Sequence, residues 1–538
     1  MSYLVGFPHL LRKWLQVLSS QSQAPHTALI IGSHSMTMLV IASITYWVYV
    51  QKQWRSLRKL LPPGPRCIPV LGNMHQVGRL PHQSFHGLSK KYGPLMYLRL
   101  GSIPTVVISS SNIAKEVFKV HDHALASRPR TTAVKYMLYD GATIAFAQYG
   151  ADWRLKRKIC TLELFTSKRL QEYKNMRMEE ICALLKSIYK DSSLSSGGNV
   201  DVSGKFSDTG LNVVSRMMLN KRIASGETTE FKTVLHELLP FIGAFNLEDF
   251  IPYLAWIDPS GCSARMKKIH RRIDHLLEDI INEHELTKTE KPMAGPKDLL
   301  DVLLNAGSDG AEKEKLSRRS IKAVVLDMFI GASDTSSHAV HWAMAELLRN
   351  PTLLKQAQLE IDSAVGYSRK VEESDLSELK FVRAIVKETF RLHPVLPMLI
   401  PRECLETCKI GGYIIPAATR VYINAWAIGR DPGVWKRPLE FYPERFLLES
   451  SHIHELDQDC EFIPFGGGRR RCPGMPLGLC IVQQTLASLL HCFDWCLPDG
   501  QLPEGVDMQE APGIVMSREK NLVVVPTPRK ATHSYVVM

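Results

Sequence analysis

One cysteine near the C-terminus lies in a local sequence that suits a metal-binding thiolate. The run Phe465-Gly-Gly-Gly-Arg-Arg-Arg-Cys-Pro-Gly474 places Cys472 between a glycine-rich segment and an apolar stretch, Met475–Leu490. Glycines let a backbone approach a flat ligand closely, and Pro473 and Gly474 fit a tight turn that opens a helix. Free main-chain N–H groups and the positive helix end lower the pKa of a thiol and favour its anion. An iron ligand requires that anion, whereas a buried structural cysteine beside a turn is the alternative interpretation.

A polar cluster inside an apolar helix is the second set of residues suited to chemistry. The pattern predicts one long helix over Ser317–Arg349, with Ser317 as its N-cap. Its middle holds Gly331-Ala-Ser-Asp-Thr-Ser-Ser337. Buried Ser, Thr and Asp are costly unless they are hydrogen-bonded, and they tend to bond to the backbone and bend the helix. The cluster therefore indicates either a functional site or a kinked core helix.

A third motif combines one carboxylate with two guanidinium groups. Glu388 and Arg391 lie three residues apart in an amphipathic stretch, Leu379–His393, which Pro394 ends. As an isolated pair they would form a surface ion pair worth about a few tenths of a kcal/mol. Arg445 follows some fifty residues later and can complete a bidentate carboxylate–guanidinium cluster.

The order and spacing of these motifs resemble the cytochrome P450 family over residues 62–520. The pattern Phe465-x-x-Gly468-x-Arg470-x-Cys472-x-Gly474 is similar to the heme-thiolate loop of that family at every defining position. The resemblance implies heme b (iron protoporphyrin IX) as the cofactor and Cys472 as the axial ligand of its iron.

Further roles follow from the same resemblance. Thr335 would hold dioxygen and a water, and Asp334 would supply protons, although Ala332 stands where the family more often has glycine. The residues implied to contact heme are Trp153, Arg157, Arg402, Phe465, Arg470 and Cys472. The residues implied to form a structural lock behind the loop, which serves folding and heme retention, are Glu388, Arg391 and Arg445.

The rest of the chain favours one mainly α domain with small β-sheets, which is the fold that the resemblance implies. Most of the interior shows helical periodicity, and no long linker or internal repeat divides the 538 residues. Short strands are predicted at Leu95–Leu100, Thr105–Ile108, Tyr413–Ile415, Arg420–Ile423 and Leu522–Val525.

The N-terminal region predicts a membrane anchor. Residues 28–50 contain no Asp, Glu, Lys or Arg, end in an aromatic group at Tyr46–Tyr49, and are long enough to span a bilayer. Four cationic residues follow within 51–60 and two precede the segment, which favours a cytosolic C-terminal side. The expected organisation is an extension, 1–27, a single transmembrane helix, 28–50, a basic and proline-rich hinge, 51–65, and a heme-thiolate catalytic domain, 66–538. The resemblance implies the endoplasmic reticulum membrane, and a buried helix is the alternative.

Charge and cysteine content narrow the partners. Lys and Arg number 66 against 54 Asp and Glu, and no nucleic-acid motif accompanies this charge, so we expect a membrane surface and an acidic protein partner. Eleven cysteines without a paired framework suit a reducing compartment. By resemblance, an electron donor docks on the cysteine side of heme, near Arg154–Lys158 and Arg469–Arg471. The chain has no flavin or nicotinamide fingerprint, so we expect a separate NADPH–cytochrome P450 reductase, with cytochrome b5 as a second donor.

The function implied by the resemblance is monooxygenation of a hydrophobic small molecule with O2 and NADPH-derived electrons. Asn424–Asp431 and Pro62–Pro65 resemble the plant A-type group of microsomal members. Four mostly apolar segments match the substrate-contact regions of the family and favour a bulky hydrophobic ligand: Thr131–Phe146, Phe241–Phe250, Val395–Leu399 and Gly513–Met516.

The substrate is expected to be a terpenoid, such as a conifer diterpenoid of the taxane type. A phenylpropanoid, flavonoid or alkaloid is the alternative. Two other classes compete with a monooxygenase: a heme-thiolate isomerase or dehydratase, which needs no reductase, and a non-catalytic heme sensor. The Asp334–Thr335 pair argues against both, because by resemblance it serves oxygen activation.

Overall fold

A computed structural model describes Met38, Thr45 and residues 58–194, 198–223, 229–243, 246–252, 258, 261–290, 298–305, 316–447 and 460–536. The chain divides into two compact units, Met1–Pro62 and Pro63–Met538. This division falls inside the predicted hinge, 51–65. The predicted extension and membrane span lie outside the described residues, apart from Met38 and Thr45.

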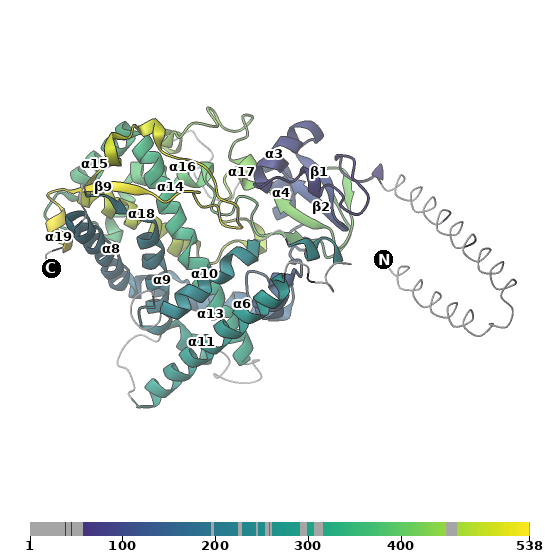
Figure 1. Ribbon diagram of the computed structural model, residues 1–538, viewed down its shortest axis with the longest axis horizontal. Coiled ribbons are helices and arrows are strands. Elements are labelled where there is room, and N and C mark those ends of the chain that lie inside the picture. The colour runs from purple at the N-terminus through teal and green to yellow at the C-terminus, as the bar shows by residue number, and fades with distance from the viewer. Residues whose placement is uncertain are drawn as a thin grey trace, which may run out of the picture. The chain divides into compact units, whose positions relative to one another are not determined.

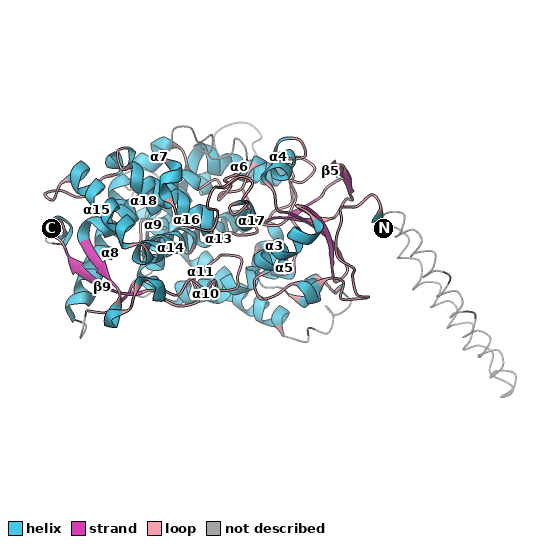
Figure 2. Cartoon of the chain, turned by 90° about the horizontal axis from the view of Figure 1, so that it is seen from above, coloured by secondary structure: helices cyan, strands magenta, loops and turns pink. Residues whose placement is uncertain are grey.

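The second unit is mainly helical, with small sheets at two ends (Figures 1 and 2). Its α-helices are α3 (Pro81–Tyr92), α4 (Ser111–Lys119), α5 (Thr132–Met137), α6 (Ala151–Ile159), α7 (Ser167–Glu172), α8 (Lys174–Leu194), α9 (Ser203–Leu219), α10 (Thr229–Gly243), α11 (Cys262–Glu290), α12 (Leu299–Asn305), α13 (Arg318–Ser333), α14 (Thr335–Arg349), α15 (Pro351–Val365), α16 (Lys380–Leu392), α17 (Ala425–Ile428), α18 (Met475–Cys492) and α19 (Thr532–Val536).

Three sheets flank the helices. One has the order β1-β2-β7-β4, built from β1 (Leu95–Leu100), β2 (Ile103–Ile108), β7 (Arg420–Ile423) and β4 (Arg402–Glu403). A second joins β3 (Val200–Asp201), β9 (Val523–Pro528) and β8 (Phe493–Cys496), and a hairpin pairs β5 (Cys408–Ile410) with β6 (Tyr413–Ile415). In Figure 1, β1 and β2 lie with α3 and α4 at one end of this unit, and β9 lies with α19 at the other. The mainly α prediction is therefore confirmed.

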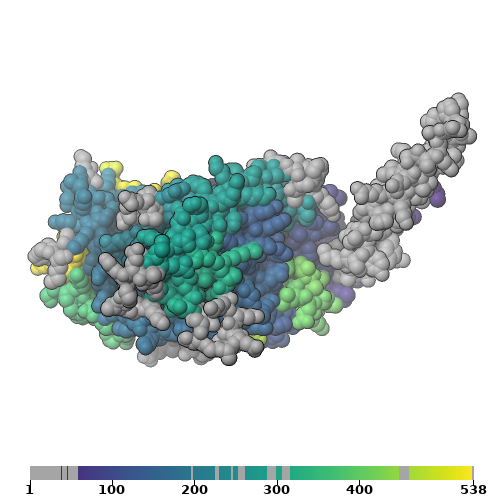
Figure 3. Space-filling model, turned by 90° about the horizontal axis from the view of Figure 1, so that it is seen from below, coloured from purple at the N-terminus to yellow at the C-terminus, as the bar shows by residue number. Residues whose placement is uncertain are grey.

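The core lies between the central helices. Buried side chains of α8, α14, α15, α16 and α18 form one cluster, and those of α5, α9, α10, α11 and α13 form another. The teal atoms of α11 cover the middle of one face (Figure 3). Among the described residues, α18 alone is long and apolar enough to cross a membrane, but 67% of it is buried inside the fold. It is therefore a core helix.

The predicted single helix over Ser317–Arg349 is wrong in one respect, because it breaks at Asp334 into α13 and α14. The hydroxyl of Thr335 donates to the Gly331 carbonyl at 2.5 Å, and that of Ser337 donates to the Ser333 carbonyl at 3.0 Å. Such side-chain bonds compete for carbonyls of the preceding turn and bend a helix.

The strand predictions are accurate where the sequence pattern is local. β1, β6 and β7 have the predicted bounds, while β2 begins two residues earlier and β9 is shifted toward the C-terminus. The short strands β3, β4, β5 and β8 were not predicted. Three of them have only two or three residues, so pairing with distant partners, rather than local pattern, determines them.

Candidate active site

The loop that carries Cys472 (Phe465–Gly474, the cysteine loop) is held in place by its glycines. Gly466 and Gly468 have φ values of 71° and 64°, a region that other residues rarely adopt. A Cβ atom on Gly467 would lie 2.6 Å from the ring of Phe118, and one on Gly468 would lie 2.2 Å from Asp122 Oδ1. The Asp122 carboxylate accepts the main-chain N–H of Arg469 at 3.0 Å. Close packing on α4 and the residues after it therefore fixes the approach to Cys472.

Cys472 is accessible, but it faces an internal cavity. Its main-chain N–H donates to the Phe465 carbonyl at 3.0 Å. Burial raises the pKa of its thiol, while the N–H groups of Gly474 and Met475 and the guanidinium groups of Arg157 and Arg471 act in the opposite direction. The predicted donors at the helix end are thus present, but the predicted net lowering of the pKa is wrong because desolvation is the larger effect. A bound metal cation deprotonates such a thiol.

Four arginines converge on the same cavity: Arg128, Arg157, Arg402 and Arg470. Desolvation lowers the pKa of each, and Arg402 further lowers the pKa of Arg128 and of Arg470, the latter to about 9. The one carboxylate paired with this group among the described residues is Asp122, 3.4 Å from Arg402. A cavity wall with this excess of buried positive charge calls for an anionic ligand.

This arrangement fits heme b. An accessible thiol with main-chain donors lies in an otherwise largely apolar cavity, beside arginines suited to the two propionate groups of heme. Of the predicted heme contacts, Trp153, Arg157, Arg402, Phe465, Arg470 and Cys472 all line this cavity. Arg128 lines it as well, and sequence reasoning missed it.

The indole of Trp153 supports the cavity wall. Its N–H donates to the Ile144 carbonyl at 3.1 Å, and the guanidinium group of Arg470 stacks 4.3 Å from its ring centre. Arg470 also donates to the carbonyls of Ala126 and Ala147 at 2.6 and 2.5 Å. Trp153 and Arg470, both predicted to contact heme, therefore also hold the segment that contains Ile144 in place.

The basic cluster at Arg154–Lys158 is only partly a surface feature. Lys156 is buried and binds Asp152 Oδ2 at 2.7 Å and the Ala142 carbonyl at 2.8 Å, while Arg157 faces the cavity. Arg154 and Lys158 are exposed, as is Arg469 of the second cluster.

Asp334, the residue at which the helix breaks, and Thr335, the first residue of α14, face different surroundings. Thr335 lines the cavity, with Gly331 and Ala332 one turn before it. Asp334 does not line it; its Oδ1 accepts the Ser207 hydroxyl of α9 at 3.3 Å. The same carboxylate raises the pKa of His338, which burial lowers more strongly. Of the two residues predicted to act together, Thr335 therefore faces the cavity and Asp334 faces α9.

The cavity above the thiol is mostly apolar. Each of the four predicted substrate-contact segments contributes to its wall, through Ile144–Phe146, Ile242, Val395, Leu396, Leu399 and Ile514–Val515. Four other residues of Thr131–Phe146 line a separate surface pocket instead: Lys135, Tyr136, Tyr139 and Asp140.

Asp327 is a polar residue of this cavity that sequence reasoning missed. Its Oδ2 accepts the main-chain N–H groups of Ile144 and Ala145, the latter at 3.1 Å. Burial raises the pKa of Asp327 to about 7, although these N–H groups and Lys156 lower it. An isolated Asp on an apolar helix carried no local signal of these partners.

The structure brings together the three residues of the predicted Glu–Arg–Arg cluster. Arg391 binds both oxygens of Glu388 at 2.7 Å, and the Nε of Arg445 lies 3.1 Å from each. Glu388 has no exposed surface. Arg391 also donates to the carbonyls of Gly429 and Pro438, so the cluster ties α16 to the segment that precedes the cysteine loop.

Comparisons with known proteins agree with this geometry. The family model described as Cytochrome P450 matches residues 62–525, so the chain belongs to the cytochrome P450 family. A flavonoid 3'-monooxygenase of Petunia hybrida is 43% identical over 88% of this chain and 94% of its own length. A phenylacetaldehyde oxime monooxygenase of Prunus mume is 39% identical over 96% and 98%. A zebrafish cytochrome P450 structure with progesterone has a TM-score of 0.71 and 28% identity, over 84% of this chain and 99% of its own.

The chain is therefore a plant-type cytochrome P450 monooxygenase. The family binds heme b through a cysteine thiolate, uses O2 and a redox partner, and acts on small molecules. The relatives do not support the terpenoid prediction. They favour the phenylpropanoid and flavonoid alternative, since several are named flavonoid hydroxylases.

Proposed function

We propose that this monooxygenase hydroxylates a planar phenolic substrate of the flavonoid or phenylpropanoid type. The observation that carries the proposal is the near full-length similarity to flavonoid 3'-monooxygenases. The apolar cavity wall is compatible with an aromatic ring system, and Thr335, Ser336 and Asp327 are among its few polar groups. A phenolic ligand would present its ring to the apolar wall and its hydroxyls to these groups.

The chain's own residues would divide the work as follows. Cys472 would hold the iron, and Arg128, Arg157, Arg402 and Arg470 would bind the propionates. Heme, when bound and reduced, supplies the activation of dioxygen. Thr335 would position a water and pass a proton on the cavity side of the helix break. Asp334 would supply that proton from the α9 side, where it contacts Ser207.

Location and electron supply are part of the same proposal. Residues 28–50 would anchor the chain in the endoplasmic reticulum membrane, with the catalytic domain in the cytosol. A separate NADPH–cytochrome P450 reductase would deliver electrons, with cytochrome b5 as a second donor. A cationic surface close to Cys472 would bind either electron donor, and it is formed by the exposed Arg154, Lys158 and Arg469.

The test is turnover by purified protein with reductase and NADPH. The panel contains a flavanone, a hydroxycinnamate, an aryl aldoxime and a taxane-type diterpene. We expect a substrate-type spectral shift and a hydroxylated product with a phenolic compound. Turnover of the diterpene alone would overturn the substrate proposal. Conversion without NADPH would instead indicate an isomerase or dehydratase.

A further inference from the structure

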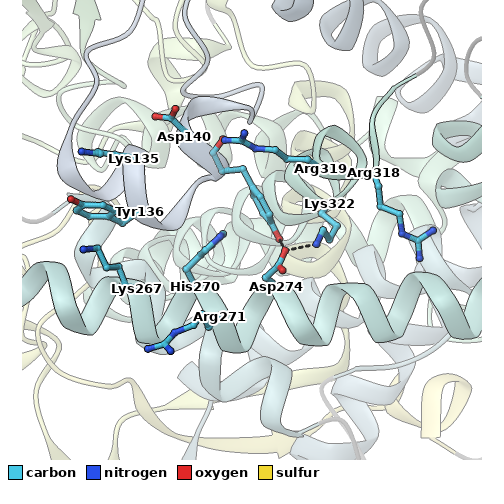
Figure 4. A pocket seen from close by; sticks show the side chains of 11 residues that line it. Lys135, Tyr136, Asp140, Lys267, His270, Arg271, Asp274, Arg318, Arg319 and Lys322 are labelled. Atoms are coloured by element: carbon cyan, nitrogen blue, oxygen red, sulfur yellow. Dashed lines mark hydrogen bonds and ion pairs between the residues drawn. The ribbon is translucent and has the colours of Figure 1, made fainter.

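A second pocket, of about 710 Å³, lies on the surface between α5, η2 (Tyr139–Gly141), α11 and α13 (Figure 4). Its wall carries two carboxylates, Asp140 and Asp274. The same wall carries six cationic side chains: Lys135, Lys267, Arg271, Arg318, Arg319 and Lys322. The pocket is therefore strongly positive.

Its carboxylates do not neutralise this charge. Asp274 is bound by Lys322 and accepts the Tyr139 hydroxyl at 2.9 Å. Asp140 pairs at 2.5 Å with Arg130, which does not line the pocket. Both wall carboxylates are thus already engaged.

Two of the six cations have carboxylate partners. Lys322 pairs with Asp274, and Arg318 pairs at 2.7 and 2.8 Å with Glu278 and Glu285. The other four, Lys135, Lys267, Arg271 and Arg319, form no ion pair with any carboxylate of the described residues. They are all exposed, so water and salt screen their repulsion in the free protein.

The wall also has aromatic rings beside its cations. Lys135 and Lys267 lie 5.0 and 4.5 Å from the ring centre of Tyr136. His270 packs edge-on against Tyr139, with the ring centres 4.8 Å apart. Several cations on one concave wall match a compact, multiply charged oxyanion.

The pocket also adjoins a strained turn. Tyr139, Asp140 and Gly141 have φ values of 52°, 53° and 77°, which are rare for a bulky residue such as tyrosine. Pocket residues hold this turn, because Arg319 donates to the Tyr139 carbonyl at 2.6 Å and Asp274 accepts the Tyr139 hydroxyl. A few residues later, Ala145 is bound by Asp327 in the wall of the active-site cavity.

We propose that this pocket binds a phosphate monoester and that its occupancy steadies the turn leading to the active-site wall. A soluble metabolite and the headgroup of phosphatidic acid both carry this group. The binding itself is independent of the proposed function. A steadier turn would raise the affinity of the active-site cavity for its substrate, and this effect rests on the proposed function. The coupling is reciprocal, so bound substrate would tighten anion binding by the same factor.

The experiment measures binding by heme-loaded full-length protein at low ionic strength. Glycerol 3-phosphate, added during calorimetry, tests the soluble source. Vesicles of phosphatidylcholine with and without phosphatidic acid test the headgroup. The variants are Lys267→Gln and Arg271→Gln, which remove charge without breaking a described hydrogen bond. The matched control is Lys268→Gln, because Lys268 is the next residue of α11, is exposed and does not line the pocket.

We expect saturable binding by the wild type and Lys268→Gln, binding about fivefold weaker in each pocket variant, and a larger loss in the double variant. Calorimetric binding would assign a soluble ligand. Without it, stronger attachment to vesicles with phosphatidic acid than to vesicles without it, with the same variant pattern, would assign a headgroup. Absence of both, or equal binding by pocket variants and control, would overturn the site. Substrate-binding spectra are recorded in a separate experiment, so the anion-binding result can be interpreted even if the substrate proposal fails.

Discussion

The carboxylate of Asp327 accepts the main-chain N–H of Ala145 at 3.1 Å, and so ties the middle of α13 to the loop that walls the active-site cavity. The carbonyl of Ala145 is in turn bound by Arg128 Nε at 2.9 Å. Both main-chain polar groups of this loop residue are therefore held by ionisable side chains. The loop is fixed by its backbone, which leaves its side chains available to meet a substrate.

Asp327 should make stability depend on pH. Burial raises its pKa to about 7, so between about pH 4 and about pH 7 the native state binds more protons than the unfolded state. Its contribution to stability is therefore greatest when it is protonated and falls as pH rises through this window. In Asp327→Asn this part of the dependence is absent. We expect the thermal midpoint of the wild type to fall more steeply than that of the variant between about pH 5 and about pH 7.

Glu510 is a control, because its pKa is shifted in the opposite direction from that of Asp327. His82 and Trp426 bind it, and its pKa is lowered to about 2. Its contribution is thus present above about pH 4.5 and is lost as pH falls toward about 2. The penalty of Glu510→Gln should stay constant between about pH 5 and about pH 8. Parallel pH profiles for Asp327→Asn and the wild type would contradict the Asp327 prediction.

The sequence predicted those site residues whose partners are set by local spacing or by a family pattern. Glu388 and Arg391 share one helix face, and Arg445 follows at the family spacing, so their cluster was predictable. Arg128 and Asp327 were not, because they bind main-chain groups 272 and 182 residues away, which leave no side-chain pattern. The separation of Asp334 from Thr335 was also missed. Consecutive helical residues point about 100° apart, and Asp334 lies on the side that contacts Ser207 of α9 rather than on the cavity side.

Replacing Glu388 with alanine should prevent heme retention. The substitution leaves Arg391, which is buried, and Arg445 without their carboxylate, a change that costs about 3–5 kcal/mol. We expect aggregated or heme-free protein, measured by heme content per protein after purification. Lys380→Ala, at an exposed position of the same helix, is the control and should purify with normal heme. A heme-loaded and active Glu388→Ala protein would show that the cluster is dispensable.

Cys472→Ser should remove the thiolate signature of the heme. The axial ligand determines the electronic properties of the iron, so the long-wavelength Soret band of the reduced carbon monoxide complex should disappear. Cys480→Ser, on the following helix and outside the cavity wall, should keep the band. The assignment of Cys472 would fail if its serine variant gave the wild-type spectrum.

Removal of residues 1–60 should release the protein from strong membrane attachment and leave heme binding intact. The described site residues all belong to the unit that begins at Pro63. Fractionation of membranes after an alkaline wash, together with the carbon monoxide spectrum, measures both properties. A truncated protein that stays in the washed membrane would place the anchor elsewhere.

The cluster at the break between α13 and α14 allows the sharpest test. If Thr335 positions a water and passes protons, Thr335→Ala should bind heme and substrate and accept electrons normally. It should nevertheless misroute those electrons, so product per NADPH should fall by about tenfold or more while hydrogen peroxide rises. Asp334→Asn should slow turnover more than it uncouples it, because the supply of protons is reduced while the hydroxyl stays in the cavity.

Ser337→Ala is the matched control for this cluster. The Ser337 hydroxyl bonds back to the Ser333 carbonyl, as that of Thr335 bonds to Gly331, but Ser337 does not line the cavity. If back-bonding is the only role of these hydroxyls, both alanine variants should lose stability and activity together, with unchanged coupling. If Thr335 acts on the reaction, only its variant should shift the ratio of product to peroxide. Normal coupling in a well-folded Thr335→Ala protein would contradict the catalytic role and show that the hydroxyl has a structural role alone.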